Sequence, residues 1–495
     1  MMRLKDAGNW WIVPLLALAG IGATGTDLPL VQAIKEQNKE AVRALLAQRV
    51  DVNAVQPDGS TALHWAVSRD NKENVDLLLR AGASVNVKNE LGATPLWLAC
   101  THGSAAMIER LLKAGADPNA ALPEGETPIM TASRTGTVDA VRLLLAHGAD
   151  VNAKEGARGQ TALMWAVAER HPEAVRALLE HGADVHARSS VRHRLVNIPA
   201  QVPGGRANPA YYLGAVEEGQ GGFTPLLFAA RQGDLESARL LVAAGANVND
   251  AAPNGASALV VAAHSGHGSL AAFLLDKGAD PNVGGAGYTA LHAAVLRGDL
   301  ALVNALLTHG ANPDTPLVKG TPARRASPDW ALSASWVGAT PFWLAAKFSE
   351  VAIMQILAAH GANPLLPKED GATPLMAAAQ GESPRAGADE EQATTGASGE
   401  QERLAFEAVK LALDLGADVN ASNVARDTAL HIAASRRLNT VVQLLADKGA
   451  KLDAKNKRGQ TPLAMTAPRA FNNYTGADPG GKTTADLLRH LGAKE

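Results

Sequence analysis

The stretch GETPIMTASRTGTVDAVRLLLAHGADVNA, residues 125–153, carries the pattern that decides the fold. Thr127 before Pro128 predicts the start of a short helix, because a Thr side chain caps the first turn and Pro suits the first helical position. The run 141–150 predicts a second helix with apolar residues on one face, and we expect Gly148 to end it in a left-handed conformation. One such helix pair cannot bury its apolar face alone, so further pairs are expected to stack on it.

The same frame recurs along most of the 495 residues and predicts an all-α repeat protein. Segment 28–54 lacks the Thr-Pro start and is interpreted as the N-terminal cap, and the unit that begins at Gly459 as the C-terminal cap. Neighbouring repeats start 32 to 34 residues apart, except at three places. The restarts are Gly59, Gly92, Gly125, Gly159, Gly222, Gly255, Gly287, Gly338, Gly371, Arg426 and Gly459.

Insertions account for the three long intervals. Segments 188–220 and 315–336 are expected to enlarge the turn between two repeats, either as ornament or as specificity elements. Segment 381–402 separates the two helices of one repeat, and its Gly, Ser and Glu content predicts a loop.

Several phrases resemble the ankyrin repeat family strongly: TALHWAV at 61–67, TPLLFAARQGD at 224–234, TALHAAVLRGD at 289–299 and GADVNA at 148–153. The resemblance runs from about residue 28 to the end of the sequence. It implies an ankyrin-repeat solenoid of about twelve helix-turn-helix units with connecting β-hairpin turns. It also implies a curved stack whose turns and first helices line a concave surface that binds a partner. The whole sequence further resembles bacterial ankyrin proteins that carry an export signal.

The N-terminal segment differs from the repeats. Arg3 and Lys5 precede the apolar run WWIVPLLALAGIGATG at 10–25, which ends in small residues. This order is typical of a secretory signal peptide, with cleavage expected after Ala23 or Gly25. The sequence therefore predicts a signal peptide at 1–25, a repeat domain at 26–495 and a periplasmic or secreted protein. The alternative is that the apolar segment is retained as an anchor.

The overall composition narrows the chemistry. A formal net charge of −3 is close to neutral for this length, so nucleic acid is not an expected partner. Cys100 is the single cysteine, which excludes an intramolecular disulfide, and it is interpreted as a small core residue. We expect a monomer with no membrane span in the mature chain.

The sequence also contains a phosphate-loop pattern, GADPGGKT at 476–483. Such a loop needs a preceding strand and an acidic metal-holding residue beyond it, and neither is recognisable here. We interpret the segment as a lengthened loop after which Thr483 or Thr484 caps the last helix.

Histidines offer no convincing metal or catalytic site. His264 and His267 could suggest a metal pair, but their places in the repeat indicate structural roles. His64, His292 and His431 are the histidines of the repeat pattern and are expected to form hydrogen bonds across the repeat turn. We therefore predict no catalytic residue, no cofactor and no metal.

Candidate partner-binding residues follow the pair of small residues in each first helix, where the resemblance places exposed concave positions. Six of them are basic, which indicates either solvated helix ends that complement the helix dipole or a surface for an acidic partner. Phe348 and Trp336 are candidate apolar anchors. The full set is Arg69, His102, Arg134, Arg231, Gln232, His264, Arg297, Lys347, Phe348, Arg436 and Trp336.

These observations predict a non-enzymatic scaffold that is exported and binds a protein partner on its concave face. Two alternatives remain open. The chain is an exported effector that acts in another cell, or it is an enzyme whose site is built from the insertions.

Overall fold

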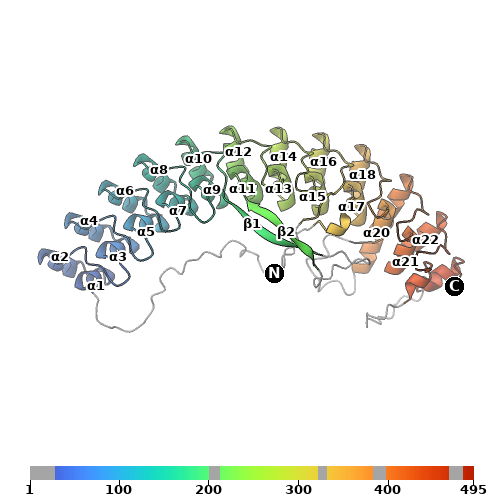
Figure 1. The fold of residues 1–495 in the computed structure, drawn as a ribbon, viewed down its shortest axis with the longest axis horizontal. Coiled ribbons are helices and arrows are strands. Elements are labelled where there is room, and N and C mark those ends of the chain that lie inside the picture. The colour runs from blue at the N-terminus through green and yellow to red at the C-terminus, as the bar shows by residue number, and fades with distance from the viewer. Residues whose placement is uncertain (1–27, 200–211, 322–331, 383–396, 468–482, 495) are drawn as a thin grey trace. The chain divides into compact units, whose positions relative to one another are not determined.

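The computed structural model describes residues 28–199, 212–321, 332–382, 397–467 and 483–494. The expected signal peptide at 1–25 and most of the phosphate-loop pattern lie outside these ranges. The chain divides into two compact units, Met1–Pro123 (unit 1) and Glu124–Glu495 (unit 2). Each unit is a series of helix pairs, which confirms the all-α repeat fold (Figure 1).

The helix pairs follow the order of the repeats. In unit 1 the first helices are α1 (Pro29–Lys35), α3 (Ala62–Ser68) and α5 (Pro95–His102), and the second helices are α2 (Lys39–Ala47), α4 (Lys72–Arg80) and α6 (Ala105–Lys113). The first helices of unit 2 are α7 (Pro128–Thr135), α9 (Ala162–Ala168), α11 (Pro225–Gln232), α13 (Ala258–Ser265), α15 (Ala290–Arg297), α17 (Pro341–Lys347), α19 (Pro374–Ala378) and α21 (Ala429–Arg436). Its second helices are α8 (Val138–Ala146), α10 (Pro172–Glu180), α12 (Leu235–Ala243), α14 (Gly268–Asp276), α16 (Leu300–Thr308), α18 (Val351–Ala359), α20 (Ala397–Asp414), α22 (Asn439–Asp447) and α23 (Thr484–His490).

Both ends of the helices form as the sequence predicts. The hydroxyl of Thr340 accepts the backbone N–H of Trp343 (3.2 Å), which caps the start of α17. Gly148 has a φ of 86° after α8, a left-handed conformation that a residue with a Cβ adopts only with strain. Short helices with sharp ends result, and consecutive pairs can stack side by side.

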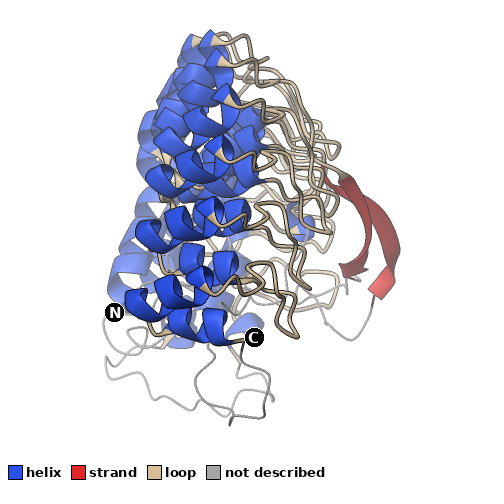
Figure 2. Cartoon of the chain, turned by 90° about the vertical axis from the view of Figure 1, so that its left-hand side faces the viewer, coloured by secondary structure: helices blue, strands red, loops and turns tan. Residues whose placement is uncertain are grey.

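Small residues let the first helices pack closely within each unit. In unit 2, Ala229 and Ala230 of α11 and Ala262 and Ala263 of α13 are buried, and the two helices lie against each other. Second helices contribute longer apolar side chains to the same core, such as Leu241 of α12. Figure 2 shows the helices on one side and the connecting turns on the other.

An asparagine in the turn after most second helices joins neighbouring repeats. The Asn152 side chain donates to the carbonyl of Gly182 (3.1 Å) and accepts the N–H of Asp184 (2.8 Å). This pairs a carbonyl at the end of α10 that no intrahelical bond can reach, and it sets the spacing of the two repeats. The same two bonds are made by Asn53, Asn86, Asn249, Asn282 and Asn420.

Buried histidines join the first helices in a similar way. The Nδ1 atom of His292 accepts the N–H of Thr289 (3.2 Å), so the ring proton lies on Nε2 and is donated to the carbonyl of Ala339 in the next repeat (3.4 Å). His64 and His431 are placed in the same way. The expected hydrogen bonds are therefore present, and each histidine also reaches the following repeat.

The connecting turns are tighter than the expected β-hairpins. The Gln56 N–H donates to the Ser60 carbonyl (2.9 Å), which closes a short turn without a strand. In the described part of the chain, isolated β-bridges occur at two turns, Ala251 with Ser257 and Ser422 with Thr428.

The first insertion contains a long hairpin that the sequence did not predict. Strands β1 (Val191–Pro199) and β2 (Tyr212–Gly221) pair antiparallel, with Val191 opposite Gly221. Figure 2 shows the hairpin extending from the side of the turns. The second insertion is closed at its base by Leu317, whose N–H donates to the Ala339 carbonyl (2.8 Å).

Helix boundaries in the third insertion and in the C-terminal repeat differ from those expected from the sequence. Residues 397–402 of the expected loop belong to α20, within which Glu400 forms an ion pair with Arg403 (2.7 Å) one helical turn later. The first helix expected after Gly459 is reduced, among the described residues, to one 3-10 turn at Ala464–Thr466. Ala467 is extended there, as a residue before proline prefers. Thr483 caps α23, as expected.

Replacing Asn152 with alanine is expected to lower the stability of unit 2 by about 1 kcal/mol, because two exposed hydrogen bonds between neighbouring repeats are lost and water replaces them only in part. The urea midpoint followed by circular dichroism measures the change. Asn304→Ala, at an exposed position of α16, is the control and should not lower the midpoint, because alanine favours a helix more than asparagine does. Equal effects of the two substitutions would contradict the bridging role.

The buried side chain of His292 is expected to make the folded protein less stable in acid. Burial lowers its pKa to about 4, against the opposing hydrogen bond to Ala339. The unfolded chain, with a pKa near 6.5, then takes up a proton that the folded chain does not, so stability falls as pH drops from about 6.5 to about 4. At pH 5 the cost is roughly 2 kcal/mol. His292→Met, a residue found at this position in other repeats, should reduce the difference between urea midpoints at pH 7 and pH 5. An unchanged difference would show that His292 does not titrate in this way.

Candidate functional site

Apart from Trp336, which belongs to a 3-10 turn at Ala334–Trp336 in the second insertion, the predicted partner-binding residues of unit 2 lie at the C-terminal ends of its first helices. We call the ends that carry Arg134, Arg231, His264 and Arg297, together with Gln232, the basic face. Arg231 is exposed and the other four side chains are half-buried. The structure therefore brings these residues to equivalent places on α7, α11, α13 and α15.

Arg134 stacks on an aromatic ring of the next repeat. Its guanidinium carbon is 5.2 Å from the centre of the Trp165 ring, and 38% of the side chain is exposed. Glu126 lies 3.5 Å from the guanidinium and also accepts the Thr131 hydroxyl (2.7 Å). The Trp165 ring and the Glu126 carboxylate together hold the planar guanidinium in place, and part of the side chain stays exposed.

Arg231 lies against two phenylalanines. Its guanidinium carbon is 5.5 Å from the Phe223 ring centre and 5.0 Å from that of Phe228. The Arg231 carbonyl accepts the Nε2 proton of His267 (3.1 Å). Burial lowers the pKa of His267, and the nearby cations Arg170 and Arg297 act in the same direction. The neutral ring closes a helix end, which supports its structural interpretation.

Arg297 is both part of the basic face and a structural group. Its Nε and Nη2 atoms donate to the carbonyl of His264 (2.9 and 2.5 Å), at the end of the preceding first helix. A cation at this place complements the negative end of the helix dipole. The His264 ring lies 5.7 Å from that of Tyr288.

Lys347 and Phe348 are not exposed, which corrects their expected availability to a partner. The Lys347 side chain is 5% exposed, and its ammonium donates to Glu382 (2.6 Å) and Gln380 (2.8 Å). Burial lowers the pKa of Lys347, and the Glu382 carboxylate opposes this shift. Phe348 is 7% exposed and packs edge-on against the half-buried Trp336, with ring centres 5.4 Å apart. Phe348 is therefore an anchor within the chain.

Arg436 belongs to this same cluster. Its Nη2 atom pairs with the second carboxylate oxygen of Glu382 (2.6 Å), while 47% of the side chain stays exposed. Lys347 and Arg436 thus share one carboxylate and join α17, α21 and the start of the third insertion. Their charges are largely used within the chain.

In unit 1, Arg69 and His102 are exposed at the ends of α3 and α5. The unit repeats the stacking seen at Arg134, because the Lys35 ammonium lies 4.4 Å from the centre of the Trp65 ring. A cation at the end of one first helix again contacts a ring on the next.

The comparison with known families agrees with this geometry. The family described as ankyrin repeats (3 copies) matches residues 30–122, 96–189, 226–317 and 400–477, which together make up more than half of the chain. The chain belongs to the ankyrin repeat family. A stretch of 107 residues, 21% of this chain, is 45% identical to a protein of Treponema pallidum (strain Nichols) named as ankyrin repeat-containing. The match spans 35% of that protein's length.

Ankyrin repeats are protein–protein interaction domains, and proteins built from them are generally non-enzymatic scaffolds. In the described part of this ankyrin chain, no group of three or more His, Cys, Asp or Glu side chains is placed to hold a metal ion. Cys100 is buried in α5, in agreement with its interpretation as a core residue, and this burial raises the pKa of its thiol. Of the helices that the structure describes, none is long and apolar enough to cross a membrane.

Sequence reasoning missed the aromatic half of the basic face. Trp165 and Phe228 stand four residues after the Thr that caps their helix, and Phe223 and Tyr288 stand directly before theirs. The residue type at these positions differs from one ankyrin repeat to the next. An aromatic residue there is therefore not required by the repeat and could have indicated a binding surface. Comparing the repeats position by position would have found it.

Proposed function

We propose that this chain is a non-enzymatic, exported scaffold that binds an acidic protein partner on the basic face of unit 2, the concave side in an ankyrin stack. The observation that carries the proposal is that Arg134 and Arg231 lie on aromatic rings at equivalent ends of first helices. A stacked guanidinium loses less side-chain freedom on binding, and its planar N–H groups match a carboxylate.

The aromatic rings supply the second part of the recognition. Trp165 and Phe223 are half-buried, so each retains apolar surface beside a cation. Aromatic and Arg side chains are enriched among the residues that dominate binding energy. Glu169, exposed at the end of α9, is an acidic residue near the same row. We infer a partner surface in which carboxylates alternate with apolar groups.

Export is a separate part of the proposal. Its support is the order of the sequence at 1–25, in which basic residues precede an apolar run and small residues. N-terminal sequencing of the protein purified from its source is expected to find a chain that begins near Thr26. A chain that keeps residues 1–25, or that fractionates with the cytoplasm, would contradict export.

Charge reversal tests the basic face. Arg134→Glu with Arg231→Glu is expected to slow association with the partner at least tenfold at low salt, because exposed charges steer the encounter. Arg297 is left unchanged, since it also closes the end of α13. The measurement compares the proteins captured from a source extract by the parent and by the variant, followed by surface plasmon resonance on those that differ.

The matched control carries the same change of net charge on another face. Arg142→Glu with Arg176→Glu alters exposed side chains of the second helices α8 and α10. Partners that the basic face binds should be lost with the first variant and retained with the control, with equal circular dichroism spectra. Loss with both variants, or with neither, would exclude the basic face as the recognition surface.

A further inference from the structure

The second helices carry a regular charge pattern on their outer surface. The second and fifth residues of these nine-residue helices are both charged in α2, α4, α8, α10 and α12. In unit 1, Arg43 at the fifth position of α2 pairs with Glu73 at the second position of α4 (2.7 Å). Within α10, Glu173 pairs with Arg176 (3.4 Å). In unit 1 the charges thus place long side chains across the outer groove between α2 and α4, whereas in α10 they pair along one helix.

Three consecutive second helices of unit 2 break this pattern. The second and fifth residues are Ser269 and Ala272 in α14, Ala301 and Asn304 in α16, and Ala352 and Gln355 in α18. Neither α16 nor α18 contains a charged residue, and α14 contains only Asp276 at its last position. Leu300, the first residue of α16, is 41% exposed. We call this outer surface of α14, α16 and α18 the uncharged face.

One other second helix, α22, also lacks both charges, with Thr440 and Gln443 at these positions. At α22 a side chain of the neighbouring helix occupies the groove: Glu402 of α20 accepts both the N–H and the hydroxyl of Thr440 (2.7 and 2.8 Å). The missing charges are thus replaced within the chain at α22. The uncharged face differs in having a hollow at the equivalent place.

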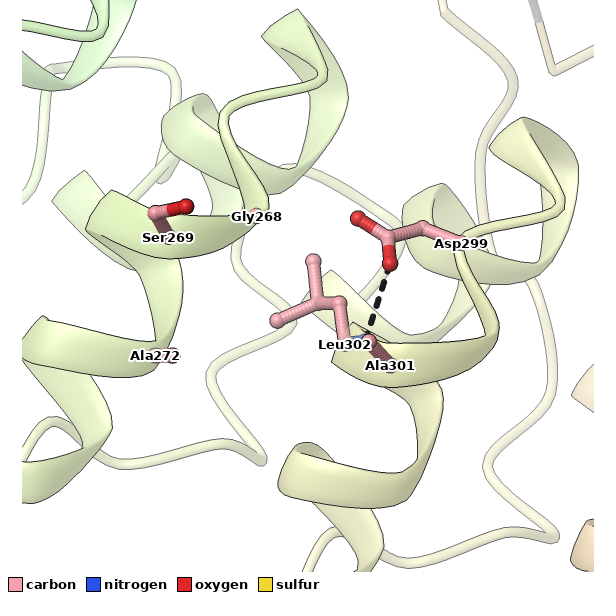
Figure 3. A pocket seen from close by; sticks show the side chains of 6 residues that line it. All are labelled: Gly268, Ser269, Ala272, Asp299, Ala301 and Leu302. Atoms are coloured by element: carbon pink, nitrogen blue, oxygen red, sulfur yellow. Dashed lines mark hydrogen bonds between the residues drawn. The ribbon is translucent and has the colours of Figure 1, made fainter.

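The hollow has a volume of about 390 Å³ and is lined by Gly268, Ser269, Ala272, Asp299, Ala301 and Leu302. Figure 3 shows the Leu302 side chain and the Asp299 carboxylate reaching from the α16 side toward α14. Ala272 and Ala301 occupy the two positions at which Arg43 meets Glu73 in unit 1. The hollow therefore stands where a long basic side chain and its carboxylate partner lie in another repeat.

One carboxylate remains at the rim of the hollow. Oδ1 of Asp299 accepts the N–H of Leu302 (3.0 Å) and caps α16. Its Oδ2 atom lies against Gly268, where a Cβ would stand 2.5 Å from it. The helices α14, α16 and α18 contain no Lys or Arg, and Lys277, His309 and His360 follow them at the opposite end. His267, which precedes Gly268, and Arg297, two residues before Asp299, both donate to carbonyls at the ends of first helices. The Asp299 carboxylate thus stands beside Ala272, Ala301 and Leu302, on a face whose three helices contain no Lys or Arg.

We propose that the uncharged face is a second docking surface, and that its occupant is an apolar helix of a protein partner that inserts one Arg or Lys side chain into the hollow. The aliphatic stem of such a side chain covers Ala272, Ala301 and Leu302, and its charged tip reaches Asp299. The partner thereby supplies the side chain that Arg43 supplies in unit 1.

The size of the face favours one helix over a second copy of this chain. A nine-residue helix is about 13 Å long, and packed helices lie about 10 Å apart. Three helices then offer roughly 400 Å², about half of what each partner contributes to a stable complex. A crossing helix can be accommodated on this area, whereas a durable dimer needs more.

This inference does not rest on the basic face. The two surfaces belong to different helices and have opposite chemistry, since one offers cations and the other a carboxylate within uncharged surface. A scaffold with both would hold two different partners at once. Failure of either surface leaves the other unaffected.

The test uses the full-length protein and a phage-displayed library of helical peptides. Selection on the parent is combined with subtraction on the double variant Ala301→Glu with Asn304→Arg, which restores the Glu and Arg found at these positions in α10 and α12. This variant should fold, because the chain already tolerates the pair in other repeats. Selected peptides are expected to carry an Arg or Lys within an apolar stripe and to bind the double variant at least tenfold more weakly.

Two further variants decide the role of each part. Asp299→Asn keeps a good N-cap but removes the charge, and should weaken the same peptides several-fold. The control Glu173→Ala with Arg176→Asn removes the equivalent charges from α10 and should leave binding unchanged. The proposal is overturned if no peptide survives subtraction, if the survivors lack a basic residue, or if Asp299→Asn has no effect. Sedimentation showing a dimer of the parent but not of the double variant would instead assign the face to self-association.

Discussion

Each repeat of this protein depends on its neighbours, because two short helices cannot bury their own apolar face. The structure meets this constraint with hydrogen bonds that cross from one repeat to the next. Asn152 bonds to a carbonyl and an N–H of the following turn, and His292 reaches the carbonyl of Ala339. Where a tryptophan replaces the histidine, at Trp343, its indole N–H donates to the Ala372 carbonyl (2.9 Å) and preserves the bridge. These bonds pair backbone groups that helix ends leave open, so spacing and stability come from the same contacts.

A scaffold fixed in this way leaves the remaining positions of each repeat available for recognition. The ends of the first helices carry cations that rest on aromatic rings, as Arg134 rests on Trp165. The outer positions of the second helices carry charged residues in five repeats, some of them in ion pairs such as Arg43 with Glu73, and small uncharged residues at Ala272 and Ala301. Both features change from repeat to repeat without altering the frame. Since repeat stability is set mainly by nearest neighbours, such local changes affect the surface more than the fold.

The insertions add surface to the protein without interrupting the stacking of the repeats. The hairpin of β1 and β2 leaves the stack between α10 and α11 and returns at Gly221, so the frame continues. Near the second and third insertions, Lys347 and Arg436 share Glu382, and Phe348 packs on Trp336. These groups, expected at a binding surface, instead hold the start of one insertion and the end of another to the repeats. The same residue types can thus serve cohesion or recognition, according to which neighbour lies within reach.

The sequence by itself determined the repeat, the capping threonines, the terminal glycines and the core position of Cys100, because these depend on local patterns that recur at a fixed spacing. Local periodicity could also place Arg134, Arg231 and Arg297 at the ends of helices. It could not show that Lys347 is buried, since its partner Glu382 lies 35 residues further along the chain. Nor could it show the hollow beside Asp299, which arises where Ala272 of one repeat meets Ala301 of the next. Burial, pairing and cavities are properties of two repeats in contact, and only the tertiary structure decides which side chains meet there.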